Sequence, residues 1–242
     1  MELPAHWHDW DLGLELPDDV SAADWLDTGL RPWGQDGLVV ANFVPASYEA
    51  FARVLHPAGD GERRDVRWAD LAARTGGHVS PDTGFRAASG LNPKGDLRAW
   101  DRAVPSDGSL PHAQLAALAA VLGTATSTPE RCMYCFWIGW GAWGEADELD
   151  RLPLVRLPHR DHYLLTGPLA RMGTAVRLEG GFERAPSLWW PADRAWFVAT
   201  EIDGYSTYVG GSAACIGAVL TCPGVEAIAV SAETPLDPWI HG

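Results

Sequence analysis

Carboxylate and imidazole side chains that could exchange protons occur at two places in the chain. Asp161 and His162 end the polar run 159–162, where an imidazole beside a carboxylate could perform acid–base chemistry or help to hold a metal. Glu201 lies within the apolar stretch Ala195–Ile202, where an acidic side chain is either solvent-facing on a strand or buried. These three residues are the candidate catalytic groups of a hydrolase or transferase. The simpler alternative for each is a solvated side chain.

Two of the four cysteines have the spacing of a redox or zinc pair. Cys132 and Cys135 are separated by two residues, but residues 136–138 are apolar and aromatic, which predicts a strand rather than a helix start. On a strand the two thiols would point to opposite faces. The other cysteines, Cys215 and Cys222, do not have the spacing of a second zinc pair. We therefore expect free thiols and no metal.

Two histidines near the start of the sequence form a further possible ligand set. His6 and His8 would project to the same side of an extended segment, with Asp9 after them, but the sequence shows no remaining ligand. The sequence also lacks Gly-rich phosphate loops and the Gly-x-Ser-x-Gly pattern of α/β-hydrolases. No cofactor is predicted.

Thirteen tryptophans are the most unusual feature of the composition. Trp137 and Trp140 lie among glycines, and Trp189 and Trp190 are adjacent and precede a proline. Neighbouring side chains of an extended segment point to opposite sides, so the adjacent pair cannot face one core. Indoles on such segments can form the wall of a pocket that stacks on sugars, planar rings or cations. These four are the candidate ligand-binding residues, and structural tryptophans are the alternative.

The charge of the chain limits the partners that it can bind. Residues 1–30 hold eight acidic residues and no Lys or Arg, and no Lys or Arg follows Arg194. A net charge of −14 repels phosphates, so we expect neither a nucleic acid nor an anionic membrane as partner. The charge permits a basic protein partner, and a solvated acidic surface is the simpler explanation. With no membrane-length apolar stretch and no signal-like N-terminus, a cytoplasmic location is expected.

Periodicity and breakers predict the main elements. Helices are expected near 65–75, 111–122 and 212–221, the last capped by Ser212. A capping box at Ser21 predicts a short helix that ends at Gly29. Strands are predicted by the apolar runs 37–44, 48–55, 132–140, 153–157, 162–166, 195–202, 205–209 and 225–230.

Three strand connections can be predicted from their residues. Pro45-Ala46-Ser47 suggests a hairpin between the runs 37–44 and 48–55, although the second run could instead be a helix. Asp203-Gly204 is typical of a two-residue type I′ hairpin turn, which requires a positive φ at Gly204. Gly210-Gly211 is expected to break the second strand of that hairpin.

Several segments resemble proteins of one group. The run 187–196, Ser-Leu-Trp-Trp-Pro-Ala-Asp-Arg-Ala-Trp, is followed by Thr-Glu-Ile-Asp at 200–203 and Ser-Thr-Tyr-Val-Gly-Gly-Ser at 206–212. With residues 53–57 and 164–169, these segments resemble a group of uncharacterised actinobacterial proteins. The resemblance spans most of residues 38–230. It implies a protein type of its own and carries no known activity.

We therefore expect an α+β fold in which a mainly antiparallel sheet is covered by a few helices, with a parallel α/β fold as the alternative. Residues 1–242 should form a single globular unit, or two lobes joined near 123–130. Two classes of function remain open. One is a non-catalytic binding protein that recognises a small molecule in a Trp-lined cleft, or a basic protein through its acidic surface. The other is a hydrolase or transferase that uses carboxylate and histidine side chains.

Overall fold

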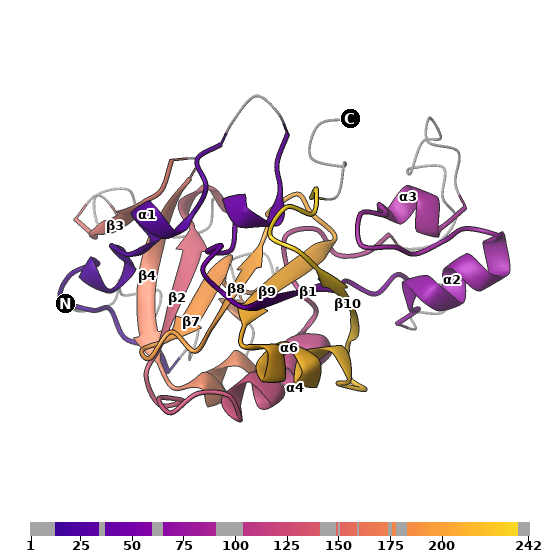
Figure 1. Ribbon diagram of the computed structural model, residues 1–242. Coiled ribbons are helices and arrows are strands. Elements are labelled where there is room, and N and C mark those ends of the chain that lie inside the picture. The colour runs from indigo at the N-terminus through magenta and orange to yellow at the C-terminus, as the bar shows by residue number, and fades with distance from the viewer. Residues whose placement is uncertain are drawn as a thin grey trace.

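An eight-stranded antiparallel sheet forms the centre of the protein (Figure 1). The structure is a computed structural model that describes residues 13–33, 37–59, 65–90, 104–140, 149, 151–158, 160–173, 176–177 and 183–236. The strand order is β10-β1-β9-β8-β7-β2-β4-β3, and every neighbouring pair is antiparallel. The predicted α+β fold is confirmed, and the parallel alternative is wrong.

The strands of this sheet are β1 (Ala50–Leu55), β2 (Cys132–Trp137), β3 (Leu154–Arg156), β4 (Asp161–Gly167), β7 (Leu188–Pro191), β8 (Trp196–Thr200), β9 (Ser206–Gly211) and β10 (Glu226–Val230). A separate ribbon consists of β5 (Val176–Arg177) and β6 (Glu183–Arg184). β1 precedes the segment 123–130 and β2 follows it, so the chain on both sides of that segment contributes to one sheet.

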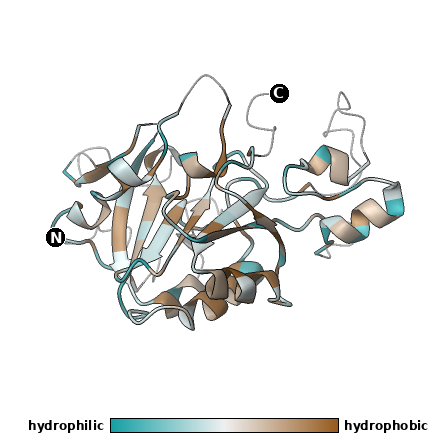
Figure 2. Ribbon diagram, viewed as in Figure 1, coloured by the Kyte–Doolittle hydropathy of each residue, from teal (hydrophilic) through white to brown (hydrophobic). Residues whose placement is uncertain are grey.

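Two helices cover one face of the sheet. They are α4 (His112–Gly123) and α6 (Ala213–Leu220), which agree with the predicted helices 111–122 and 212–221. The Ser212 side chain accepts a hydrogen bond from the Cys215 amide, as expected of an N-cap. Apolar side chains of both helices pack on the strands, and Figure 2 shows brown segments both in the strands and in the two helices.

The opposite face is covered by residues 20–33 and 37–44 rather than by a strand hairpin. These residues contain a 3-10 turn at Ser21–Ala23, α1 (Leu26–Gly29) and a second 3-10 turn at Val40–Asn42. The predicted capping box is wrong, because neither short helix has a side-chain cap and the Ser21 amide instead bonds to Asp19. The predicted hairpin 37–44/48–55 is also wrong, because β1 pairs with β9 and β10.

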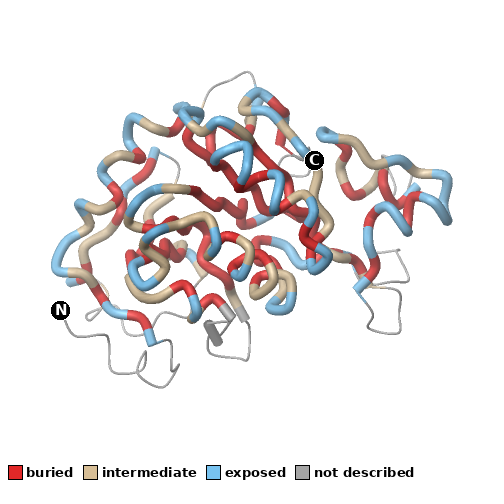
Figure 3. Tube along the Cα trace, turned by 60° about the horizontal axis from the view of Figure 1, so that its bottom comes forward, coloured by how far each residue is buried: buried red, intermediate tan, exposed pale blue. Residues whose placement is uncertain are grey.

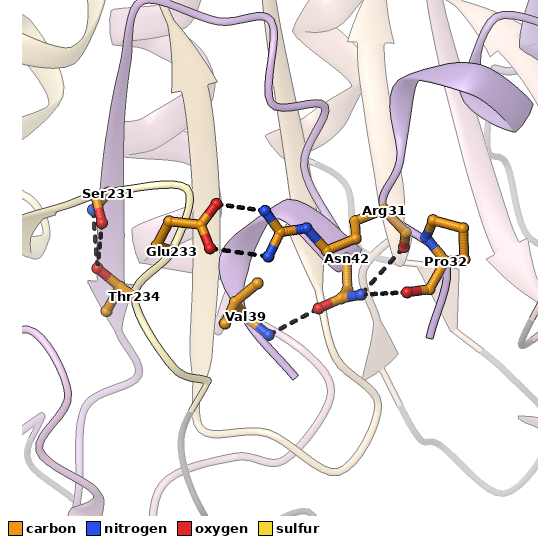
Figure 4. A network of polar contacts seen from close by, with 7 residues as sticks. All are labelled: Arg31, Pro32, Val39, Asn42, Ser231, Glu233 and Thr234. Atoms are coloured by element: carbon orange, nitrogen blue, oxygen red, sulfur yellow. Dashed lines mark hydrogen bonds and ion pairs between the residues drawn. The ribbon is translucent and has the colours of Figure 1, made fainter. Parts of the chain in front are cut away.

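One amide side chain explains why residues 37–44 bend. Asn42 accepts a hydrogen bond from the Val39 amide at 2.8 Å and donates to the carbonyls of Arg31 and Pro32 (Figure 4). Arg31 in turn forms a two-pronged ion pair with Glu233, which follows β10. These contacts fold the segment back on itself and fasten it across the sheet, which competes with an extended strand.

A third apolar cluster lies beside the sheet, formed around α2 (Trp68–Thr75) and α3 (Phe85–Ala88). The buried Arg53 of β1 connects this cluster to the sheet: it donates to the hydroxyl of Ser206 at 2.9 Å and to the carbonyl of Thr83 at 2.8 Å. Its guanidinium also lies over the Trp68 ring. Burying this charge is tolerated because several acceptors and an aromatic ring surround it.

The central strands are buried on both faces. Every residue of β7, β8 and β9 is buried, and Figure 3 shows red tube through the middle of the molecule with pale blue segments outside it. The predicted strand break at Gly210-Gly211 is therefore wrong, since both glycines belong to β9. A Cβ on Gly210 would come within 2.6 Å of Val44 Cγ1 and 2.8 Å of Tyr48 Cδ2, so glycine is required by close approach rather than by a turn.

The predicted hairpin between 195–202 and 205–209 is present as β8 and β9, but its turn type is wrong. Five residues, 201–205, separate the strands, and Gly204 does not have a positive φ. The Gly204 amide donates to the Glu201 carbonyl at 3.0 Å, and its own carbonyl accepts from the Gly108 amide at 3.0 Å. Contact with the segment around Gly108 favours this wider turn over the local type I′ preference.

None of the helices in the described part of the chain is long and apolar enough to cross a membrane.

Replacing Gly210 by alanine should destabilise the fold by about 1–3 kcal/mol, because the added methyl group must displace Val44 or Tyr48 from a packed contact. The matched control is Gly217→Ala on the exposed side of α6, where nothing lies within 4 Å of the new Cβ. That variant should gain up to about 1 kcal/mol from helix propensity. Urea denaturation measures both, and a Gly210→Ala variant as stable as the parent would contradict close packing of Val44 and Tyr48 on Gly210.

Candidate functional site

Three of the predicted site residues meet at one end of the sheet. β2 ends at Trp137, which pairs with His162 at the start of β4. Glu201 directly follows β8, and the amide of Thr200 before it bonds to the carbonyl of Ser187, whose own amide bonds to the Cys135 carbonyl. Because neighbouring strands are antiparallel, the end of β2, the start of β4 and the end of β8 lie at the same end of the sheet.

Glu201 is a buried acid held by an arginine. Its side chain is 2% exposed, and Oε2 accepts a hydrogen bond from Arg160 Nη1 at 2.5 Å. Oε1 is buried and has no hydrogen-bond partner. Burial raises the pKa of this carboxyl above its usual value, and the hydrogen bond and the charge of Arg160 offset only part of that rise. Of the two expectations for Glu201, the solvent-facing one is therefore wrong.

Two indole rings flank the cation that pairs with Glu201. The guanidinium carbon of Arg160 lies over the ring of Trp33 and over the ring of Trp137, 5.7 Å from each centroid. The Arg160 side chain is 16% exposed, so this group reaches the protein surface. We call Arg160, Glu201, Trp33 and Trp137 the Arg160 cluster. A second arginine, Arg184, lies 3.9 Å from the ring centroid of Trp140, whose ring packs edge-on against Trp137.

Sequence reasoning identified Glu201 and Trp137 but missed Arg160 and Trp33. Arg160 lies inside the polar run 159–162. The signal that could have led to it is Glu201, because an acid buried in an apolar strand is expected to have a cationic partner. Trp33 belongs to the segment that covers the sheet, and nothing near it in the sequence indicates its contact with Arg160.

The other two acid–base candidates do not form a pair. His162 is buried with its residue 2% exposed, whereas Asp161 forms an ion pair with Arg156 at 3.1 Å near the surface. Alternation along β4 turns Asp161 and His162 to opposite faces. His159 and the His6-Trp7-His8-Asp9 run lie outside the described residues. Within the described residues, no three His, Cys, Asp or Glu side chains gather as a metal site would require.

The adjacent tryptophans Trp189 and Trp190 each belong to a hydrophobic core. Trp189 packs edge-on against Trp196 on the face covered by α4 and α6, with ring centroids 5.1 Å apart. Trp190 stacks on Phe197 at 5.5 Å on the opposite face. The pair was expected not to fit one core, and the sheet resolves this by having a core on each face. Of the four predicted wall residues, Trp137 and Trp140 are the ones with exposed surface.

Comparisons with protein-family models, with curated proteins and with solved structures give no match for this chain. The resemblance to actinobacterial proteins stays a prediction. The function is therefore inferred from the geometry of the site.

A second polar chain, which the sequence did not suggest, lies on the face of α4 and α6. The buried His56 ring donates from Nδ1 to the Ser106 carbonyl at 2.6 Å, so its Nε2 accepts from the Thr207 hydroxyl at 2.9 Å. The Thr200 hydroxyl lies 2.8 Å from that of Thr207 and can complete the chain. Burial lowers the pKa of His56 to about 4, which keeps the ring neutral. All of these polar atoms are satisfied within the protein, which indicates a structural role.

A concave region of about 370 Å³ lies elsewhere, between α4 and the turn Leu169–Gly173. Small apolar side chains line most of it, including those of Ala119 and Leu169. The turn follows the far end of β4 from His162, so this hollow and the Arg160 cluster lie at opposite ends of the sheet. Glu130, which also lines the hollow, is exposed, and none of the other lining residues carries a polar side chain, so we place the candidate site at the Arg160 cluster.

Lowering the pH from about 6.5 to about 4 should cost stability through His56. The ring stays neutral in the folded state until its pKa of about 4, whereas in the unfolded chain it takes up a proton below 6.5. Its contribution is complete above 6.5 and should fall by roughly 3 kcal/mol by about pH 4. Denaturation of parent and His56→Gln protein across this range measures the difference. The variant should be less stable at pH 7 and show a shallower decline, and identical slopes would contradict a buried neutral His56.

The four thiols should be unreactive in the folded protein. All are free and buried, and burial raises the pKa of Cys132 to about 11 and also raises that of Cys135. Iodoacetamide at pH 8 should label none of them at an appreciable rate, because all four side chains are shielded and the thiolates of Cys132 and Cys135 are scarce. After denaturation without reductant, mass spectrometry should show four labels. Rapid labelling of Cys132 or Cys135 in the native protein would instead indicate a redox role.

Proposed function

We propose that this chain is a non-catalytic binding protein that takes an organic ligand at the Arg160 cluster. The observation that carries the proposal is a partly exposed cation flanked by two indole rings beside a buried carboxylate with one unpaired oxygen. Aromatic faces and a fixed acceptor are the groups that orient small molecules in binding sites. A buried acceptor without a partner costs stability, and a donor on the ligand would recover it.

The arrangement supports recognition better than acid–base catalysis. Glu201 is held in an ion pair with Arg160, and Asp161 is paired with Arg156 on the opposite face of β4 from His162. His162 is buried, and alternation along β4 turns it away from Asp161, its neighbouring carboxylate. The alternative of a hydrolase or transferase therefore lacks an assembled set of groups.

We also propose that the protein is located in the cytoplasm. Four free cysteines are typical of a compartment in which thiols are kept reduced, and they support this location.

A ligand at this site should quench tryptophan fluorescence in a saturable way. Titration of a panel containing tryptamine, benzamidine, agmatine and N-acetylglucosamine tests this, with melting curves as a second readout. A ligand at 100 times its Kd should add about 2.7 kcal/mol of stability. Trp137→Leu should weaken binding about 2- to 30-fold, the range expected for a lost cation–π or stacking contact of roughly 0.5–2 kcal/mol.

The matched control is Trp189→Phe, because Trp189 lies in the core on the other face of the sheet. It should lower stability and leave the affinity unchanged. The proposal fails if no compound in the panel quenches or stabilises the folded protein. It also fails if a ligand that binds is unaffected by Trp137→Leu.

A further inference from the structure

We infer that the Arg160 cluster is a guanidinium-binding site in which Arg160 occupies the place of the ligand. The ligand is then a second guanidinium group that displaces Arg160. This inference rests on the proposed function, since it names the chemical class of ligand for the same site.

The first support is the incomplete pairing of Glu201. A guanidinium normally forms two parallel hydrogen bonds with a carboxylate. The exposed pair Arg31–Glu233 in this chain has that form, with Nη1 bonded to Oε2 and Nη2 bonded to Oε1. Arg160 makes one bond, from Nη1 to Oε2, and leaves Glu201 Oε1 buried without a partner. The carboxylate therefore offers a second acceptor that Arg160 does not use.

The second support is the planar aromatic setting. Trp33 and Trp137 each present a ring 5.7 Å from the guanidinium carbon, near the outer limit of about 6 Å for a cation–π contact. A guanidinium that also reached Oε1 would be held between two rings and two oxygens. An ammonium ion lacks the planar fork, so the geometry favours guanidinium over a simple amine.

The third support is that Arg160 can leave without disturbing the sheet. It lies in the connection between β3 and β4, where its carbonyl accepts a hydrogen bond from the Leu157 amide, and its side chain alone enters the cluster. Glu201 has a guanidinium partner both before and after the exchange: Arg160 in the free protein and the ligand in the complex. The net charge of −14 also favours the approach of a cation.

Two sources could supply the guanidinium: a free guanidino compound or an arginine side chain of a basic protein. Both present the same chemistry to Glu201 and the two indoles. The experiment below includes an arm that separates them.

The test compares the parent with Arg160→Ala, Arg160→Lys and the matched control Arg156→Ala. Arg156 lies on β3 in the same hairpin, with its side chain 75% exposed and paired to Asp161. The probe is methylguanidinium chloride at low millimolar concentration, against equal concentrations of methylammonium chloride and sodium chloride. Melting temperature and tryptophan fluorescence are recorded at each concentration.

The expected result is specific rescue of the emptied site. Arg160→Ala should melt below the parent, and methylguanidinium should restore the melting temperature saturably, whereas methylammonium should restore much less. Arg156→Ala should melt near the parent and show no rescue. The parent should bind agmatine about tenfold or more weakly than Arg160→Ala, because Arg160 competes for the site. Adding Glu201→Gln to the parent should remove this binding.

Two results would overturn the inference. One is a folded Arg160→Ala protein with no saturable response to methylguanidinium. The other is rescue of the variant with no binding to the parent even at a hundred times the concentration that saturates the variant, because Arg160 would then be a permanent structural partner. If Arg160→Ala does not fold, the same titration is made with Arg160→Lys. A rise of its melting temperature with methylguanidinium supports the inference, and an unchanged melting temperature contradicts it.

The remaining arm identifies the source of the group. The peptide Gly-Arg-Gly and its match Gly-Lys-Gly are titrated beside agmatine. Tighter binding of the arginine peptide than of agmatine supports a protein ligand, and the reverse supports a free guanidino compound. Binding of N-acetylglucosamine or tryptamine without any response to a guanidinium compound would contradict this inference and leave the proposed binding function standing.

Discussion

Burial of the central strands on both faces is the constraint on which the rest of the structure depends. Antiparallel sheets commonly keep one face in water, but here α4 and α6 cover one face and residues 20–33 and 37–44 cover the other. Polar groups in or next to these strands then have little access to water and must find partners inside the protein. His56, Arg53 and Glu201 are three such groups, and each is engaged by neighbouring elements. The site proposed above lies where this internal pairing is incomplete, at Glu201 Oε1.

The elements that could be predicted are those set by local pattern. The helices α2, α4 and α6 follow apolar periodicity, and the paired strands β8 and β9 follow two apolar runs separated by turn residues. The failures have tertiary causes. Gly210 was taken as a break because nothing in the sequence shows that Val44 and Tyr48 pack against its backbone. The run 37–44 has the composition of a strand, but Asn42 bends it through bonds to Val39, Arg31 and Pro32.

The candidate site shows the same division. Glu201 could be singled out because an acid in an apolar strand is unusual, and Trp137 because of its glycine neighbours. Their partners could not be found, because Trp33, Arg160 and Glu201 come from three distant segments that only the folded sheet brings together. Trp189 and Trp190 were candidates on the argument that one core cannot hold both. That argument assumed a single core, whereas the sheet has one core on each face and each tryptophan is buried in one of them.

The position of β1 has a consequence for the growing chain on the ribosome. β1 spans residues 50–55, and its two neighbours in the sheet are β9 and β10, at 206–211 and 226–230. While β2, β4, β7 and β8 emerge and pair, both edges of β1 stay without a native neighbour, and sheets with such distant contacts form slowly. Throughout that interval Ala50-Phe51-Ala52-Arg53-Val54-Leu55 is an apolar strand sequence interrupted by one cation. Charges at such positions hinder edge-to-edge aggregation. The charge of Arg53, which in the folded protein links β1 to the segment before α3, is the feature of this strand that would oppose such aggregation in the nascent chain.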